Sequence, residues 1–378
     1  MDGRLTDHRN INLSRLNRDI IRGEARGRVI WQPRILCWYA DKVYNGGQLP
    51  QPLTGMTQAQ MYRRLGISNR IYEYTDCIES VMPESIKFTT ESLSPLETLR
   101  KFETPVGTVT MIYRGNESNP GIFPSKWFVE TEEDLRVIIY VIENTTFRFN
   151  MKTYDSLQEE WGDIGLPTAI IPRSNIHSLM HDHMGVEAAI FALYDFTDTV
   201  EAYFRALSDA HQRYIQVVNQ SPIEWVNFGD NVHSKVINLE QFKKYLLPEY
   251  QKRNEALHRA GKFTFAHWDG DTGEILPYAH ETGLDGIEAI TPLPQGDVTL
   301  EQIKAGLGDD MYLVDGIAAV LFEDTYSEDA LIEQTKRLID MFPDRLILGI
   351  SDEMPSRGLL DRVNLVTQIV DEHNAGKG

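Results

Sequence analysis

Short apolar runs alternate with longer amphipathic stretches through the second half of the chain. The apolar runs lie at residues 168–171, 223–228, 263–267, 286–290, 311–314 and 346–350, and helical patterns fill most of the intervals between them. This alternation predicts successive βα units and a parallel sheet. With an earlier apolar run at 29–31 the number of strands approaches eight. The pattern therefore predicts a (β/α)₈ barrel of the TIM type over residues 28–378.

Two further segments differ from this rhythm. Residues 13–26 carry an apolar stripe of helical period, so residues 1–27 are expected to form an N-terminal helical extension. Residues 79–114 instead alternate with period two between Ser, Pro and Gly positions, which predicts an antiparallel β-meander inserted in the barrel. Thr131 and Asp134 have the spacing of an N-cap and its N3 partner, and predict the start of another helix.

Carboxylates follow four of the apolar runs. These acidic residues are Asp230, Asp269, Asp315 and the pair Asp352 and Glu353. In a parallel barrel the carboxyl ends of the strands meet at one face, where active sites lie, so we expect these groups around one pocket. Asp and Gly after a strand also suit a turn or a helix cap, and this alternative stays open for each residue alone.

His267 and Asp269 form the most informative pair. Residues i and i+2 of a strand point to the same side, so the two side chains can converge on one metal ion or one proton. A divalent ion would take His267 and Asp269 from one strand, with Asp352 or Glu353 as a further ligand across the barrel, and would leave a position open for substrate. The alternative is a hydrogen-bonded His–Asp pair that orients a substrate without metal.

Other polar residues near the strand ends are assigned to catalysis or substrate binding. Asp230 and His233 are candidates for a general acid or base, because burial at a strand end would raise a carboxyl pKa toward the useful range. Arg34 is a candidate anchor for a substrate carboxylate or phosphate, with an internal salt bridge as the alternative. Trp38, Asn231 and Asp315 complete the predicted substrate-binding set, Trp38 as part of a pocket wall.

Composition limits the partners. The 378 residues include 37 Lys and Arg against 56 Asp and Glu, a formal charge of 37 − 56 = −19, which opposes binding to nucleic acid or to an anionic membrane. The only cysteines are Cys37 and Cys77, too few for a disulfide framework or a four-thiolate metal site. No apolar span of membrane length occurs. We expect a cytoplasmic protein acting on a small molecule.

The order and spacing of several motifs resemble the uroporphyrinogen decarboxylase superfamily. The resemblance covers the chain from about Arg28 to its end and implies a (β/α)₈ barrel. That superfamily includes the cofactor-independent decarboxylase of haem synthesis and zinc methyltransferases that work with corrinoid proteins. The motifs are Val29–Arg34, Asn227–Asn231 followed by a helix with Leu247–Pro248, Ala266–Gly270, Glu281–Asp285 and Leu348–Pro355.

Departures from the family pattern separate its branches. The decarboxylase has a second arginine after the first strand, where this chain has Trp38, so a substrate with as many carboxylates as a porphyrinogen is disfavoured. The methyltransferases bind zinc through His-x-Cys and a later cysteine. Here His267 matches the histidine, Asp269 replaces the first cysteine, and the last strand offers Asp352 and Glu353 but no thiol. Carboxylate ligands keep zinc as the first choice and make iron or manganese credible.

The resemblance thus implies an enzyme. The first expectation is metal-assisted methyl transfer, or related bond cleavage, on a small substrate. A corrinoid would be carried by a separate partner protein, because the chain has no Asp-x-His-x-x-Gly cobalamin-binding signature. The alternative is a metal-free decarboxylase or other lyase acting on a carboxylate held by Arg34.

Overall fold

The computed structural model describes residues 12–44, 48–115 and 123–377. The chain divides into two compact units. The first comprises residues 1–76, 151–170 and 222–378, and the second comprises residues 77–150 and 171–221. No helix among the described residues is both long and apolar enough to cross a membrane.

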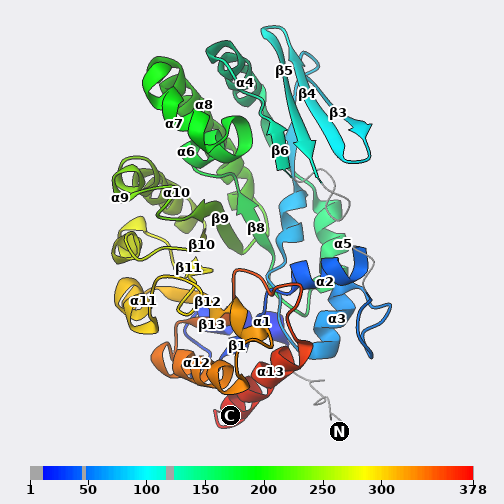
Figure 1. Ribbon diagram of the computed structural model, residues 1–378, viewed down its shortest axis with the longest axis vertical. Coiled ribbons are helices and arrows are strands. Elements are labelled where there is room, and N and C mark those ends of the chain that lie inside the picture. The colour runs from blue at the N-terminus through cyan, green and yellow to red at the C-terminus, as the bar shows by residue number, and fades with distance from the viewer. Residues whose placement is uncertain (1–11, 45–47, 116–122, 378) are drawn as a thin grey trace. The chain divides into compact units, whose positions relative to one another are not determined.

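A curled sheet of seven parallel strands forms the centre of the first unit (Figure 1). The apolar runs of the sequence become these strands, and β10, β12 and β13 are buried along their whole length because helices cover the sheet. In spatial order the strands are β1 (Ile30–Trp31), β13 (Leu346–Ser351), β12 (Tyr312–Ala318), β11 (Gly286–Glu288), β10 (Phe263–Trp268), β9 (Trp225–Val232) and β8 (Thr168–Ile171).

The predicted eight-stranded closure is only partly realised. Residues 67–71 occupy the interval between β1 and β8 as an irregular segment. The amide of Ser68 donates to the carbonyl of Trp31 at 3.0 Å, and Ile71 makes an isolated parallel bridge with Pro167. Ser68, Asn69 and Arg70 are three consecutive buried polar residues. Their side chains therefore do not alternate between a buried and an exposed face, as those of a regular strand would. The described chain therefore has seven barrel strands and one irregular connection.

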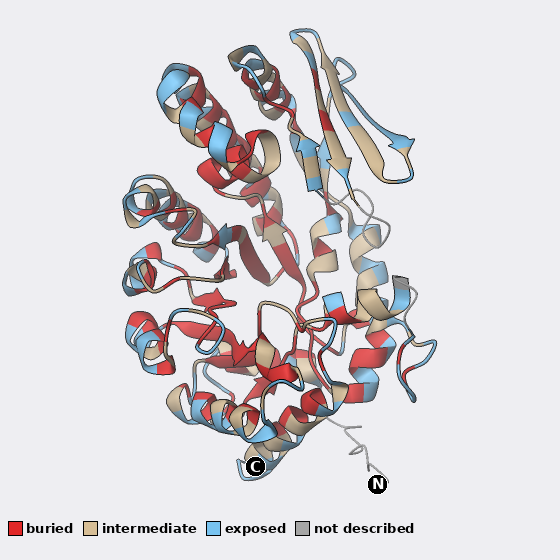
Figure 2. Cartoon of the chain, viewed as in Figure 1, coloured by how far each residue is buried: buried red, intermediate tan, exposed pale blue. Residues whose placement is uncertain are grey.

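The helices of the first unit lie outside the sheet, and most of them have buried residues on one side and exposed residues on the other (Figure 2). The N-terminal helix is shorter than predicted and ends at Ile21, because Gly23 and Arg26 adopt positive φ angles that a right-handed helix cannot continue. The interval between the apolar runs at 263–267 and 286–290 contains a 3₁₀ segment, Leu276–Thr282, in place of an α-helix. The helices are α1 (Leu13–Ile21), α2 (Leu36–Tyr44), α3 (Gln58–Leu65), α5 (Met151–Trp161), α9 (Leu239–Gln241), α10 (Leu247–His258), α11 (Leu300–Leu307), α12 (Glu328–Met341) and α13 (Leu360–Ala375), with further 3₁₀ segments at Tyr72–Cys77 and Ala319–Phe322 and a π segment at Phe242–Leu246.

An apolar cluster fills the amino-terminal end of the strands. Leu16 and Ile20 of α1 pack there with Trp225, Phe263 and Phe265, each a residue near the start of its strand. This packing removes large aromatic surfaces from water and fixes one end of the sheet. His267 and Glu288 lie at the opposite, carboxyl ends of β10 and β11.

The second unit contains antiparallel sheet and helices. A four-stranded sheet has the order β3–β4–β5–β6, and β2 pairs separately with β7. Helix α4 begins at the predicted capping box, in which Thr131 and Asp134 bond reciprocally. The elements are β2 (Ile78–Val81), β3 (Lys87–Ser94), β4 (Glu97–Thr104), β5 (Gly107–Arg114), β6 (Phe123–Lys126), α4 (Glu132–Asn144), β7 (Thr146–Phe149), α6 (Asn175–Ser178), a π segment (Leu179–Met184), α7 (Val186–Asp195) and α8 (Thr197–Gln220).

Candidate metal centre

His267 lies near the end of β10, and its Nδ1 faces a carboxylate on the next strand. His267 is the direct register partner of Glu288, the last residue of β11. The distance from His267 Nδ1 to Glu288 Oε2 is 3.0 Å. Phe265, two residues before His267, belongs to the apolar cluster, so the period of the strand turns the imidazole to the same interior side.

Glu288 is held as a carboxylate by the groups around it. Its side chain is buried and accepts hydrogen bonds from the Tyr72 hydroxyl at 2.5 Å and from Asn227 Nδ2 at 2.6 Å. Burial acts to raise the pKa of Glu288, but the charges of Arg70 and Arg34 and the bond from His267 outweigh it and hold that pKa well below the ordinary value. Arg34 Nη1 also lies 3.3 Å from His267 Nδ1. The contact with the ionised Glu288 is shorter, at 3.0 Å, so the Nδ1–H donates to that carboxylate and the lone pair is left on Nε2.

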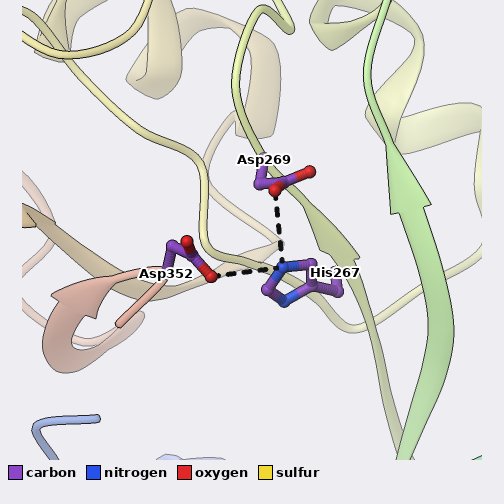
Figure 3. Close-up of side chains that lie close together, drawn as sticks. All are labelled: His267, Asp269 and Asp352. Carbon is purple, nitrogen blue, oxygen red and sulfur yellow. Dashed lines mark ion pairs between the residues drawn. The ribbon is translucent and has the colours of Figure 1, made fainter. Parts of the chain in front are cut away.

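His267 Nε2 points toward two further carboxylates (Figure 3). It lies 4.0 Å from Asp269 Oδ2 and 3.8 Å from Asp352 Oδ1. One ligand atom from each of these three residues lies within 4.8 Å of the others. Tetrahedral ligand bonds of about 2.0–2.2 Å place donor atoms about 3.3–3.6 Å apart. The two distances from His267 Nε2 are close to this separation, and a small movement of the two aspartate side chains would complete the set. The nitrogen and oxygen donors therefore fit a divalent metal.

The carboxylates outnumber the cations around this triad. Burial raises the pKa of Asp269, and the neighbouring Asp352 acts in the same direction while His267 opposes it. Burial likewise raises the pKa of Glu353, against the opposing charge of Arg34. A bound divalent cation would relieve the repulsion between Asp269 and Asp352, which supports the same assignment.

Arg34 is paired within the chain. Its Nη2 lies 3.2 Å from Glu353 Oε1, and its Nη1 lies 3.9 Å from both Glu288 Oε1 and Asp352 Oδ1. The internal salt bridge left open by the sequence is thus present, and a substrate anion is not needed to balance this guanidinium. Glu353 pairs with Arg34 and is not one of the three clustered metal-ligand candidates.

Arg70, a second arginine beside Glu288, is fully buried and was not predicted as a site residue. Arg70 Nε lies 3.1 Å from Glu288 Oε1, and its Nη2 lies 2.5 Å from Asp315 Oδ1. Burial raises the pKa of Asp315 to about 7, against the opposing charge of Arg70. Arg70 comes from the irregular segment 67–71, which has no period that could have marked it. Glu288 did carry a signal, since it is the only charged residue in the apolar run 286–290.

The other predicted site residues lie in different surroundings. Asp230 is buried and contacts Tyr250 of α10, whose ring also packs on Phe228 at a centroid distance of 5.2 Å. Phe228 and Asp230 share a side of β9 that faces α10, whereas Asn227 points to Glu288. This differs from the expected position in the shared pocket. The alternation of the strand explains it, because β9 continues to Val232 and does not end at Asp230.

The four remaining site candidates also differ in whether they lie near the triad. Asn231 is exposed, and the imidazole of His233 lies against Gly270, next to Asp269. Trp38 is buried and donates from Nε1 to the carbonyl of Gly358 at 3.0 Å, which makes it a structural contact. Asp315 lies inside β12 rather than at its end, and its carboxylate binds Arg70.

Backbone strain concentrates at the strand ends that carry the site. Asp352 has φ = 65°, Asp315 has φ = 86° and Ala289 has φ = 68°, all in the left-handed region. Non-glycine residues rarely adopt these angles, and such strain often marks functional positions. Each residue lies within or just after one of the adjacent strands β11, β12 and β13.

The strain at Asp352 gives a stability prediction. We expect Asp352→Gly to be more stable than Asp352→Ala by about 1 kcal/mol, because glycine adopts a positive φ without the Cβ penalty, and this gain exceeds its larger chain entropy when unfolded. Urea unfolding of the two variants measures the difference. Equal stability, or a more stable alanine variant, would show that the backbone at residue 352 is not left-handed.

The fold has a counterpart among solved structures. No protein-family model and no curated protein sequence matches the chain. A methyltransferase from Methanosarcina mazei superposes with a TM-score of 0.54 at 14% sequence identity, over 96% of this chain and 99% of that one. This likeness shows that the two chains share a fold.

Two further structures superpose less well. A putative vitamin-B12-independent methionine synthase from Listeria monocytogenes gives a TM-score of 0.39 at 14% identity, over 60% of this chain and 71% of that one. A GH18 chitinase from Flavobacterium johnsoniae gives 0.33 at 9% identity, over 59% of this chain and 82% of that one. Neither likeness is close enough to add to the description of the fold.

Proposed function

We propose that the chain is a metal-dependent enzyme of the uroporphyrinogen decarboxylase superfamily that transfers a methyl group, or cleaves a related bond, on a small substrate. The observation that carries this proposal is the position of His267 Nε2 between the carboxylates of Asp269 and Asp352, at 4.0 and 3.8 Å. The fold shared with a methyltransferase and the family motifs around these residues support the type of reaction.

The proposed metal ligands are His267, Asp269 and Asp352. A divalent ion held there, zinc being the first candidate, would act as a Lewis acid that lowers the pKa of a substrate thiol or hydroxyl. The chain's own contribution is orientation. Glu288 fixes the tautomer of His267, and the guanidinium groups of Arg34 and Arg70 keep Glu288 ionised so that it can do so.

The metal-free decarboxylase is the weaker candidate. It would use Arg34 to anchor a substrate carboxylate and Asp230 to donate a proton. Arg34 already lies within 3.9 Å of three carboxylates of the chain, and Asp230 contacts Tyr250. These contacts do not favour either role, although His233 beside Asp269 remains available as a proposed acid or base.

A transfer assay tests the reaction. Purified protein is incubated with methylcobalamin, as a stand-in for a corrinoid carried by a partner, and with a panel of small thiols, while loss of the cobalt–methyl absorbance is followed. We expect methylation of at least one thiol, no reaction with His267→Ala, and retained reaction with Asp271→Asn, an acid that pairs with Lys235 outside the triad. Failure with every thiol, together with release of CO₂ from a carboxylate substrate, would replace methyl transfer by the decarboxylase alternative.

A further inference from the structure

A hollow in the second unit has the composition of a cation site. It has a volume of about 530 Å³ and is lined by Trp127, Met184, Gly185, Phe191 and the first turn of α7, which carries Glu187. This volume lies within the range of about 300–1,000 Å³ that is usual for small-molecule sites. The lining is aromatic and aliphatic apart from the single carboxylate of Glu187.

The aromatic wall is built into the fold. Trp127 follows β6 directly, and the amide of Val129 donates to the carbonyl of His183 at 3.0 Å, which ties the tryptophan segment to the residues before α7. Gly185 has φ = +84°, and a Cβ at this position would lie 2.7 Å from Trp127 Nε1. Only glycine therefore lets the indole lie this close to the backbone, and Trp127 is held in place without a ligand.

The charge of the hollow is negative. Lys126, which directly precedes Trp127, has partners outside the lining of the hollow. Its Nζ lies 3.2 Å from Glu130 and donates to the carbonyl of Thr110 at 3.0 Å. Helix α7 contains no basic residue. Glu187 is exposed, lines the hollow together with Trp127 and Phe191, and forms no ion pair within the part of the chain that the structure describes.

Phe191 adds an accessible ring to this wall. It lies one helical turn after Glu187, and 59% of it is exposed. Residues i and i+4 of a helix lie on the same face, so the carboxylate and the ring are neighbours. Exposing a phenylalanine ring beside a negative charge costs free energy in water. An apolar cation that covers the ring removes this cost and is attracted by both the ring and the charge.

We infer that this hollow binds an alkylated ammonium group of a small molecule. A quaternary ammonium carries its charge under a methyl surface, so it is attracted by the faces of Trp127 and Phe191 and by the Glu187 carboxylate, and it loses less hydration than a bare ammonium. The inference is independent of the proposed metal centre, since all of its residues belong to the second unit.

Choline and its uncharged carbon analogue 3,3-dimethylbutan-1-ol form a matched pair of probes. The chain has six tryptophans, so ¹⁵N-labelled indole groups give few signals, and Trp127→Phe identifies the signal of Trp127. We expect choline to shift that signal saturably and to bind at least about fivefold more tightly than the alcohol. Equal affinity for the two probes, or no shift of any indole signal by choline, would overturn the inference.

Variants at exposed positions keep the test decisive should Trp127→Phe fold poorly. Glu187→Gln and Phe191→Leu are each expected to weaken choline binding by at least about threefold, because each removes one attraction to the cation. Phe88→Leu serves as the matched control, since Phe88 is also an exposed phenylalanine of the second unit, at 45%. Unchanged binding by Glu187→Gln and Phe191→Leu would exclude this hollow as the site.

Discussion

Replacing Arg70 with methionine is expected to lower the free energy of unfolding by about 3–5 kcal/mol. Arg70 is 1% exposed and pairs with both Glu288 and Asp315, whose side chains are equally buried. Without the guanidinium, Asp315 loses the cation with which it pairs, and Glu288 keeps only the longer 3.9 Å pair with Arg34. Methionine fills a similar volume, so the loss of unfolding free energy measures the removal of the charge and not the creation of a cavity. Urea unfolding followed by circular dichroism measures the change.

Arg63 provides the matched control for this substitution. It pairs with Asp163 at 2.7 Å, but its side chain is 38% exposed and that of Asp163 is 60% exposed. Exposed pairs contribute little, so Arg63→Met is expected to cost less than about 1 kcal/mol. Similar losses for the two variants would show that Arg70 is not the central cation of a buried network.

Replacing His267 with alanine is expected to weaken binding of a divalent metal by at least about 100-fold. It should lower the free energy of unfolding of the metal-free protein by only about 1–3 kcal/mol, because the buried Glu288 loses one of its hydrogen bonds. The imidazole supplies the one nitrogen donor, and its removal leaves Asp269 and Asp352 without a common third ligand. Glu288→Gln should have a smaller effect of about 10- to 100-fold, because Glu288 orients His267 and does not belong to the triad. Competition for Zn²⁺ with a chromogenic chelator measures both affinities.

Asp271→Asn is the control for general electrostatic effects on metal binding. Asp271 follows Asp269 by two residues but forms an ion pair with Lys235. Its substitution removes one negative charge near the site and should leave the affinity within about twofold of the parent. A loss as large as that of His267→Ala would indicate that overall charge, and not the triad, attracts the metal.

The metal-site triad illustrates what a sequence can predict. Alternate residues of a strand share a side, which predicts the pairing of His267 with Asp269. Parallel strands present their carboxyl ends together, which predicts Asp352 near that pair. The structure brings one ligand atom of each to within 4.8 Å of the others. The same alternation, counted onward from Asn227, assigns Asp230 to the side of Phe228. The expected position of Asp230 in the pocket requires a strand that ends at that residue, whereas β9 continues to Val232.

The groups that support His267 needed information that a single sequence lacks. Glu288 meets His267 because the two are register partners on neighbouring strands, and register depends on the whole sheet. Arg70 reaches Glu288 from the irregular segment 67–71, which has neither helical nor strand periodicity, and Tyr72 reaches it from the start of the 3₁₀ segment Tyr72–Cys77. Burial of Arg70 also contradicts the usual placement of arginine at the surface, so composition gave no hint.

Elemental analysis of the purified protein tests the central claim most directly. The account predicts close to one divalent metal ion per chain in the parent protein and in Asp271→Asn, and its loss from His267→Ala. Absence of stoichiometric metal from the parent protein after purification with added Zn²⁺, together with activity that survives a strong chelator, would contradict the metal centre and assign the reaction to the metal-free alternative.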